Sequence, residues 1–387
     1  MNITRRIFLF LVIFCATERY RSADAIELSL EISASNLTCA AYTCKNADQK
    51  FINDTCVYYD RDLNAYFSKK CSDTSKACLL EGEHPGNYTC QPYISSNGLS
   101  WPGEPCTTIT DCEQTYSKAC TGGICVGYPV SATCEDSNYC QPGNSCRGSP
   151  LTCQAQIQVG STGCLSDADC TNDAACNITS NTNGALNACL PAFSIQPHQP
   201  VGGCVNGVSN LCRQVTCAAH LGGFYCTDQV FSDYNVPKPC DLTKTGQCVS
   251  TEDEFFTPAF QLISDCECGY NREGLSYCAL FPGDGLYQAY INTVVMWLNS
   301  TGILKCNTLR RDQTNCMKSY MDAKQFNRYV YYEFVKELYP KIYQSEDCVV
   351  DTVTSFYAKA RDNYDADNED FAVSIAGITF LLGLALN

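Results

Sequence analysis

The chain has 387 residues, of which 31 are cysteine and three are histidine, and its formal net charge is −15. A chain this acidic is repelled by nucleic acid and by anionic membranes, so both are excluded as favoured partners. The cysteine content indicates an oxidising compartment, in which thiols pair and stay paired.

The first segment predicts export from the cell. Residues 7–16 form an apolar run behind two arginines, and small residues suit cleavage after Ala25. We therefore expect a signal peptide over residues 1–25. The alternative is an uncleaved anchor, but this run is only about half of the ~20 residues that a spanning helix needs. Cleavage removes Cys15 and leaves an even number of cysteines, which predicts a fully disulfide-bonded chain.

Residues 26–92 predict an N-terminal cysteine-rich domain, and the Gly, Pro and Ser-rich stretch 93–105 predicts a linker or exposed loop. Residues 106–190 then hold three quartets of cysteines, each opening with C-x5-C, which indicates an internal repeat. The quartets are Cys106, Cys112, Cys120 and Cys125; Cys134, Cys140, Cys146 and Cys153; and Cys164, Cys170, Cys176 and Cys189. Units this short cannot bury an adequate core, so disulfides of about 2–4 kcal/mol each must substitute for packing.

The third quartet opens with CLSDADC at residues 164–170, which resembles the start of the Dickkopf N-terminal cysteine-rich module, where C-x-S-D-x-x-C recurs. The first quartet keeps the aspartate before its second cysteine, and the second keeps only the spacing. With the stretch NDTCVYYD (53–60) and an apolar tail, the layout looks like the cysteine-rich surface proteins of ciliates. The resemblance implies an extracellular module and does not imply the receptor signalling of Dickkopf proteins.

A second Pro and Gly-rich linker is expected at residues 191–203, followed by a second cysteine-rich region at 204–279 with irregular spacings. One interpretation of this region is a degenerate continuation of the array. Its closest pair, Cys266 and Cys268, is a C-x-C rather than the C-x-x-C of redox enzymes, so we expect two structural half-cystines with different partners.

Residues 280–361 predict a mainly α-helical, membrane-proximal domain. One amphipathic helix follows Asp284 as its N-cap, a second covers 315–339 and ends or kinks before Pro340, and a third covers 349–361. The predicted fold class is therefore small disulfide-rich modules in tandem, with short β-hairpins and little other regular structure, followed by a helical domain. The tyrosines of the second helix predict ordinary packing, with a binding face as the alternative.

Cysteine parity links the two parts of the chain. Residues 39–278 and the helical part, which contains Cys306, Cys316 and Cys348, each hold an odd number of cysteines. Full pairing within one chain therefore requires at least one disulfide between the helical part and the region before it. We expect Cys278 or a neighbouring cysteine to supply the partner.

The C-terminal sequence predicts a lipid anchor. The acidic spacer 362–370 precedes an uncharged apolar tail, 371–387, which is the layout of a glycosylphosphatidylinositol attachment signal. The candidate attachment residues are Asn363, Asp362 and Ala366. A type I membrane protein with a C-terminal transmembrane helix is the alternative, which we disfavour because no Lys or Arg follows the tail.

Candidate chemistry is sparse. No catalytic, cofactor-binding or metal-binding residue is predicted, since His84, His198 and His220 lie in loop-like sequence without a zinc or nucleophile motif. Asp167, Asp169 and Asp173 suggest a solvated turn rather than a calcium site. Five sequons predict N-glycosylation of Asn36, Asn53, Asn87, Asn177 and Asn299.

These features favour a non-catalytic, glycosylated coat, adhesion or recognition protein, reached through the secretory pathway and held on the outer face of the plasma membrane. Its expected partner is an extracellular protein or glycan, with no nucleic acid and no cofactor. The first alternative is a secreted or shed cysteine-rich ligand or inhibitor. A further alternative is an extracellular enzyme, for which only the helical part could hold an active site.

Overall fold

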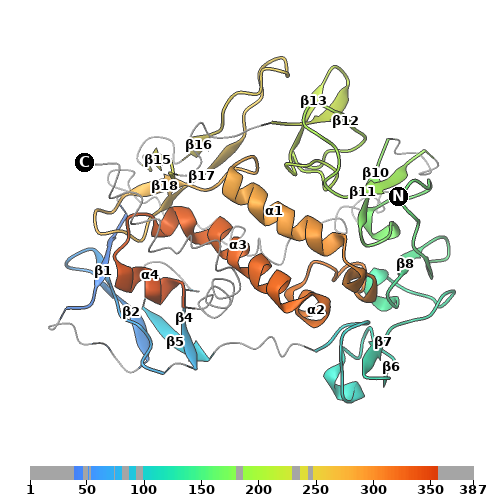
Figure 1. Ribbon diagram of the computed structural model, residues 1–387, viewed down its shortest axis with the longest axis horizontal. Coiled ribbons are helices and arrows are strands. Elements are labelled where there is room, and N and C mark those ends of the chain that lie inside the picture. Colours follow the sequence, from blue (N-terminus) through green and yellow to red (C-terminus); the bar gives the residue numbers. More distant parts are fainter. Residues whose placement is uncertain are drawn as a thin grey trace, which may run out of the picture. The chain divides into compact units, whose positions relative to one another are not determined.

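The computed structural model describes residues 39–46, 51, 54–73, 75–80, 87–92, 99–179, 186–228, 236–242 and 247–355. It has the predicted fold class: tandem disulfide-rich units with short strands, followed by helices (Figure 1). Every cysteine from Cys39 to Cys348 is disulfide-bonded. The predicted signal peptide, acidic spacer and apolar tail lie outside the described residues.

One disulfide pattern recurs in six units, which we number in chain order. In each unit the first of four cysteines bonds the third, and the second bonds the fourth. The bonds are Cys56–Cys78 and Cys71–Cys90 in unit 1; Cys106–Cys120 and Cys112–Cys125 in unit 2; Cys134–Cys146 and Cys140–Cys153 in unit 3; Cys164–Cys176 and Cys170–Cys189 in unit 4; Cys204–Cys217 and Cys212–Cys226 in unit 5; and Cys240–Cys266 and Cys248–Cys278 in unit 6. The three predicted quartets are units 2–4, and units 5 and 6 continue the array.

A β-hairpin explains this pattern. In every unit the third and fourth cysteines are cross-strand partners of an antiparallel pair, so each presents its sulfur to one of the two cysteines that come before the hairpin. The hairpins are β4 (Lys76–Leu79) with β5 (Tyr88–Pro92), β6 (Ala119–Thr121) with β7 (Ile124–Val126), β8 (Asn144–Arg147) with β9 (Thr152–Ala155), β10 (Ala174–Asn177) with β11 (Ala188–Pro191), β13 (Cys217–His220) with β14 (Gly223–Cys226), and β17 (Ile263–Cys268) with β18 (Ser276–Cys278).

A short turn precedes the second cysteine of units 2, 3 and 4: Ile109–Asp111, Ser137–Tyr139 and Asp167–Asp169. Asp111 Oδ2 accepts hydrogen bonds from the Thr107 and Thr108 N–H groups, and Asp169 Oδ2 accepts from those of Leu165 and Ser166. The aspartate that the sequence shows before the second cysteine therefore closes the turn. Unit 3 has Tyr139 there and uses Asp136 as a cap instead.

Residues before each unit also take part in it. Ser100, Tyr128, Ile157 and Ile195 form parallel bridges with the second cysteines of units 2–5. Parts of the stretches expected as linkers, 93–105 and 191–203, thereby pair with the units that follow them. Strand β12 (Pro200–Val201) also adds to β14, while β15 (Pro239–Cys240) and β16 (Gln247–Val249) flank the unit 6 hairpin.

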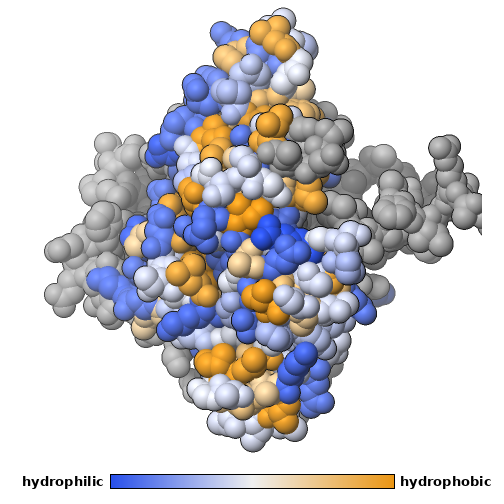
Figure 2. All heavy atoms as spheres, turned by 90° about the vertical axis from the view of Figure 1, so that its right-hand side faces the viewer, coloured by the Kyte–Doolittle hydropathy of each residue, from blue (hydrophilic) through white to orange (hydrophobic). Residues whose placement is uncertain are grey.

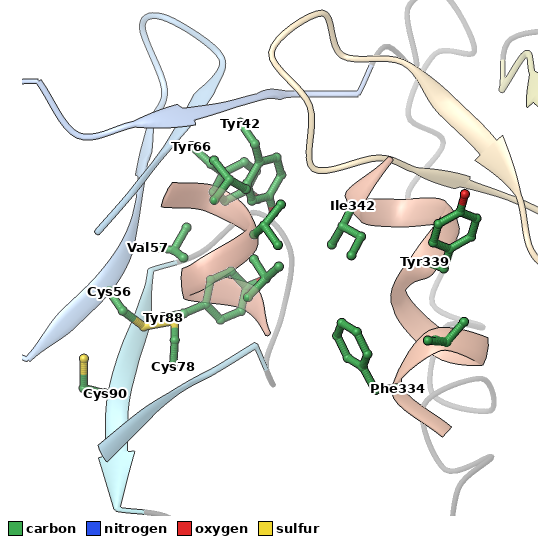
Figure 3. Packing of buried hydrophobic residues seen from close by; sticks show 14 of the residues in the cluster. Tyr42, Cys56, Val57, Tyr66, Cys78, Tyr88, Cys90, Phe334, Tyr339 and Ile342 are labelled. Carbon is green, nitrogen blue, oxygen red and sulfur yellow. A yellow bond between two sulfur atoms is a disulfide. The ribbon is translucent and has the colours of Figure 1, made fainter. Parts of the chain in front are cut away.

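Unit 1 belongs to a five-stranded sheet in the order β1-β3-β2-β5-β4, with β1 at Ala41–Cys44, β2 at Thr55–Asp60 and β3 at Ala65–Ser68. Buried side chains of this sheet, including Tyr42, Tyr66 and Tyr88, share one apolar cluster with Phe334 and Ile342 of the helical part (Figure 3). The N-terminal domain thus shares one core with residues 331–353, and a second buried cluster, which contains Trp297 and Met317, lies within the helical part. We call the sheet and the helices together the central body.

Four helices follow unit 6: α1 (Gly285–Leu298), α2 (Thr314–Tyr320), α3 (Ala323–Ile342) and α4 (Asp347–Val353). Asp284 is the N-cap of α1, as predicted. The single helix expected over 315–339 is wrong. The backbone is extended at Met321, and Asp322 restarts the helix by accepting from the Lys324 and Gln325 N–H groups.

Of the two outcomes expected at Pro340, an end of the helix there is wrong, because α3 includes this proline in its last turn, where its missing N–H costs a single hydrogen bond. A kink at this proline stays a prediction. The third helix starts at Asp347, two residues before the predicted start; the expected residues 356–361 lie outside the described part. None of the helices formed by the described residues is long and apolar enough to cross a bilayer.

The predicted bond between the helical part and the region before it is confirmed, since Cys348 bonds Cys44 of strand β1. The other two helical cysteines, Cys306 and Cys316, bond each other. The expected donor was wrong, since Cys278 is bonded to Cys248 within unit 6. As predicted, the two cysteines of the C-x-C have different partners. Cys266 bonds Cys240, and Cys268 bonds Cys39.

A loop of the helical part holds units 2–4. The buried Asn307 Nδ2 donates to the Ser137 and Cys140 carbonyls of unit 3, each at 2.8 Å. In the opposite direction, the buried Asn172 Nδ2 of unit 4 donates to the Ile303 and Cys306 carbonyls at 2.8 and 2.9 Å. Units 3 and 4 of the array therefore contact the central body through side-chain amides that donate hydrogen bonds to backbone carbonyls.

Unit 2 completes this interface. The Arg310 guanidinium lies 3.5 Å from the centre of the Trp101 ring, and the Tyr320 hydroxyl donates to the Gly103 carbonyl. A Cβ at Gly103 would lie 2.1 Å from the Lys305 carbonyl oxygen, so this close approach requires glycine. Three consecutive units thus contact the segment between α1 and α3.

Candidate functional site

The most distinctive polar contact outside the cores joins unit 5 to the loop of unit 6. His198 Nε2 lies 2.9 Å from Asp253 Oδ1 and 3.1 Å from Oδ2. An ionised carboxylate only accepts hydrogen bonds, so a bond to it from this ring requires the tautomer with the proton on Nε2. The Asp253 side chain is 3% exposed, whereas that of His198 is 38% exposed, so a buried acid holds the ring of a half-exposed histidine.

Backbone groups complete the environment of Asp253. Its Oδ2 atom accepts from the Asp228 N–H at 2.8 Å, and its Oδ1 atom accepts from the Phe255 N–H at 3.2 Å. These bonds satisfy a carboxylate that would otherwise be costly to bury. They also fix the segment after Cys226 against the loop between β16 and β17.

Aromatic rings surround this pair. The His198 ring stacks on Phe255 with centroids 4.6 Å apart, and His220 lies 4.9 Å from the same ring. Tyr225 and Phe256 also contact Phe255, at 5.5 and 5.2 Å. Two of the three histidines of the chain therefore meet at one aromatic cluster. We call the surface formed by His198, His220, Tyr225, Asp253 and Phe255 the unit 5 surface.

Backbone strain concentrates beside the unit 5 surface. Nine non-glycine residues of the described chain have positive φ, and five of them lie between positions 193 and 221: Phe193, His198, Asn206, Val215 and Leu221. Positive φ is unfavourable for residues that carry a Cβ, and such residues persist where surrounding structure holds them, often at functional sites. Unit 5 is thus the most strained part of the array.

The arrangement suits binding better than covalent chemistry. A histidine aligned by a buried carboxylate is one part of a nucleophilic site, but that chemistry also needs a hydroxyl or thiol within hydrogen-bond reach. In the ranges that the structure describes, no hydroxyl or thiol is hydrogen-bonded to the His198 ring. What the surface offers is rigid aromatic area with a polar rim.

The sulfur atoms form a second class of candidate site. In at least five of the units, three sulfurs lie within 4.8 Å of one another, for example those of Cys134, Cys140 and Cys153. That spacing would also suit a metal, but metal-binding cysteine is a thiolate, and here each sulfur is bonded to another. The two disulfides of a unit instead pack against each other as its core.

Two of the aspartates considered above as calcium ligands, Asp167 and Asp169, are hydrogen-bonded within the protein. Asp167 Oδ1 accepts from the Cys176 N–H and Oδ2 from Asn210 Nδ2, and Asp169 is buried in its turn. The Asp173 Oδ1 atom has no hydrogen-bond partner among the described residues. These bonds give Asp167 and Asp169 a structural role within unit 4.

Three of the five predicted glycosylation sites are described, and they differ in their surroundings. Asn87 and Asn299 are exposed, while Asn177 is half-buried with its Oδ1 atom accepting from the Gly202 N–H at 2.6 Å. The Asn87 Oδ1 atom accepts from the Tyr59 N–H. Glycosylation of all five stays a prediction. Outside the described residues lie Asn36, Asn53, His84, Asp362, Asn363 and Ala366.

The unit 5 surface was not predicted from the sequence, in which its histidines were expected to be ordinary loop residues. His198 and Asp253 are 55 positions apart, and no motif connects them. Comparison of the chain with models of protein families, with curated proteins and with solved structures found no match.

Proposed function

We propose that this chain is a non-catalytic, glycosylated recognition protein on the outer face of the plasma membrane, held there by a glycosylphosphatidylinositol anchor. The observation that carries the proposal is the complete pairing of the cysteines from Cys39 onward. Disulfides in this number fit an extracellular or secretory-pathway protein. They also leave no free thiol among those thirty cysteines for catalysis or metal binding.

Recognition is favoured over a purely structural coat by the unit 5 surface. A coat needs stable units, which the disulfides supply, but it does not need strained backbone or exposed aromatic rings held in place by a buried carboxylate. The resemblance of CLSDADC (164–170) to Dickkopf-type modules, and of the whole layout to ciliate surface proteins, supports the same proposal.

Phosphatidylinositol-specific phospholipase C tests the anchor. Intact cells that express the full chain are treated with the enzyme, and we expect the protein to appear in the medium without residues of the apolar tail. Retention on the cells would favour a C-terminal transmembrane helix. Spontaneous appearance in the medium together with a soluble partner would favour the shed ligand or inhibitor. Intact mass with and without reduction then reports the disulfides and glycans together.

A further inference from the structure

The disulfides of the chain differ in how accessible they are, and the difference singles out unit 2. Across the face that Figure 2 shows, apolar residues form small separate groups among hydrophilic ones, so no broad apolar surface stands out there. Among the described disulfides, only Cys106–Cys120 of unit 2 and Cys44–Cys348 contain no buried cysteine. Because thiol–disulfide exchange requires access of a thiolate to a disulfide sulfur, these two bonds are the first that an external thiol will attack.

A second disulfide lies directly beside the Cys106–Cys120 bond. The sulfurs of Cys106, Cys112 and Cys125 are within 4.8 Å of one another, and Cys112 and Cys125 form the inner bond of unit 2. These two cysteines are 0% and 1% exposed, so an external thiol does not reach their bond. A thiolate formed at Cys106, in contrast, already lies close to both sulfurs of the inner bond.

The inner bond supports the segment by which unit 2 contacts the central body. The Gly103 N–H donates to the Cys125 carbonyl at 2.8 Å, and the Cys125 N–H donates to the Glu104 carbonyl at 2.9 Å. The Gly103 carbonyl in turn accepts from the Tyr320 hydroxyl of the central body. A change in the partner of Cys125 therefore acts on residues that belong to the interface.

We propose that unit 2 contains a site of thiol–disulfide exchange whose substrate is an external dithiol, and that Cys106 transfers the reduction from the exposed bond to the inner bond. The exchange changes the covalent support of the interface between unit 2 and the central body. This goes beyond the proposed recognition function and does not depend on it.

The reaction balances with the dithiol as its one reductant. A thiolate of the dithiol attacks the Cys106–Cys120 bond and forms a mixed disulfide. The second thiol then attacks that bond, so the dithiol leaves as a cyclic disulfide and both cysteines are free. The Cys106 thiolate next attacks Cys112 or Cys125, forms a disulfide with it and releases the other as a thiolate, which takes up the proton that Cys106 lost. The two electrons of the dithiol thus end on Cys120 and on one cysteine of the former inner bond.

Limited reduction followed by mapping of the free thiols tests the proposal. The full chain is treated with increasing dithiothreitol, its thiols are trapped with a maleimide at low pH, where thiolates are scarce, and the labelled cysteines are identified by mass spectrometry. If the alternative bonds are equally stable, Cys106, Cys112 and Cys125 share one free thiol. Cys106 should then carry about one third of the label found on Cys120.

The Cys44–Cys348 bond is the matched control, because it also has no buried cysteine but lies outside the six units. Its two cysteines should be labelled equally. Equal labelling of Cys106 and Cys120, with no label on the inner bond, would overturn the transfer. Labelling of the buried disulfides of units 3 and 4 at the same dithiothreitol concentration would show that unit 2 is not selectively reduced, and would overturn the proposal as well.

Two variants test the role of Cys106 without any reductant. Cys120→Ser leaves Cys106 as a free thiol beside the inner bond, whereas Cys106→Ser leaves Cys120, whose sulfur does not belong to the group of three. Both variants lose the same disulfide, so a loss of stability is common to the two. We expect label on Cys112 or Cys125 in Cys120→Ser only. Label confined to the remaining unpaired cysteine in both variants would contradict the transfer.

Discussion

The array and the central body are stabilised in different ways. The buried cluster of unit 4 consists of four cysteines and Ala174, and that of unit 3 of three cysteines. The central body instead buries Trp297, Phe334 and Val349, with 2% of their surface exposed at most. Units of fewer than about 40 residues rarely bury enough apolar area to fold alone, so covalent bonds replace packing in the array.

The same difference appears in the reach of the disulfides. Bonds within units 2–5 join cysteines 12 to 19 positions apart, as in Cys134–Cys146 and Cys170–Cys189. The central body has short-range bonds too, but it also contains two bonds that join residues 229 and 304 positions apart, Cys39–Cys268 and Cys44–Cys348. Each unit of the array is therefore closed by bonds between nearby residues, whereas the two long-range bonds of the central body join the N-terminal part of the chain to its C-terminal part. Four predictions test this contrast.

Removal of the longest disulfide should have the largest effect. In the double variant Cys44→Ser and Cys348→Ser, loss of the cross-link frees the ends of the chain in the unfolded state. The loop-entropy relation gives a loss of about 4–5 kcal/mol in the free energy of unfolding, even with Cys39–Cys268 still shortening the loop. Denaturant unfolding followed by the fluorescence of the two tryptophans measures it, since Trp297 lies in the body and Trp101 lies at the interface of unit 2 with it.

The matched control is the double variant Cys134→Ser and Cys146→Ser, which opens a bond of 12 positions in unit 3. We expect a loss of about 3 kcal/mol, confined to the array. Equal losses in the two variants, or unfolding of the whole chain by the unit 3 variant, would show that the array and the body form one cooperative structure.

Loss of a docking amide should have the next largest effect. Asn172→Ala removes the donor to the Ile303 and Cys306 carbonyls, which leaves buried acceptors unsatisfied at a cost of about 2–4 kcal/mol. The exposed amide of Asn210, which donates to Asp167, provides the control Asn210→Ala, expected to cost less than about 1 kcal/mol. Hydrogen exchange of the segment around Ile303 should rise only in Asn172→Ala; unchanged exchange there would contradict the docking role.

The disulfide-rich units could be predicted from the sequence, but the contacts that join them to the helical part could not. The quartets were visible because C-x5-C repeats at a regular distance, and the hairpin that pairs the third and fourth cysteines lies within each repeat. The parity argument showed that a bond to the helical part must exist. It could not identify Cys44, because β1 and α4 meet through a core built from side chains some 300 positions apart.

The unit 5 surface could not be predicted from the sequence either, because it also depends on contacts between residues far apart in the chain. Nothing local to His198 indicates Asp253, and the strain at Leu221 is visible only once the turn has φ values. One signal was available: the hairpin turn that is Gly-Gly in unit 2 is Leu-Gly in unit 5.

A buried acid at the docking interface predicts pH dependence. Glu104 is 2% exposed, its Oε2 atom accepts from the Trp101 N–H, and its Oε1 atom has no hydrogen-bond partner among the described residues. Burial raises the pKa of Glu104 above its usual value, against the opposing effects of that N–H and of the Arg310 charge. The folded state therefore holds a proton at pH values where the unfolded state has lost it.

The free energy of unfolding should then fall as pH rises from about 4.5 through the raised pKa, with a slope of at most about 1.4 kcal/mol per pH unit from this group. Glu104→Gln cannot titrate, so its stability curve should lack that slope. Denaturant titrations of both proteins between pH 4 and pH 8 measure the difference. Parallel curves would contradict the assignment of a titrating carboxyl at the interface.

The smallest effect is expected at the turn of unit 2, where the disulfides already fix the chain. Hydrogen bonds from the Thr107 hydroxyl and the Thr107 and Thr108 N–H groups lower the pKa of Asp111 to about 2. Because a lowered pKa stabilises the folded state above the usual value of 3.8, this contribution is lost only as pH falls from about 4 to 2.

Asp111→Asn should shift the melting temperature at pH 7 by less than about 2 °C and should remove the acid sensitivity of unit 2. Unit 3, which has Tyr139 at the equivalent position and still forms its turn, is the internal reference. Calorimetric scans at pH 7 and pH 2.5 measure both effects. A large fall in melting temperature at pH 7 would mean that local hydrogen bonds, rather than the two disulfides, determine the stability of unit 2. The contrast between an array held by covalent bonds and a body held by packing would then be wrong for this unit.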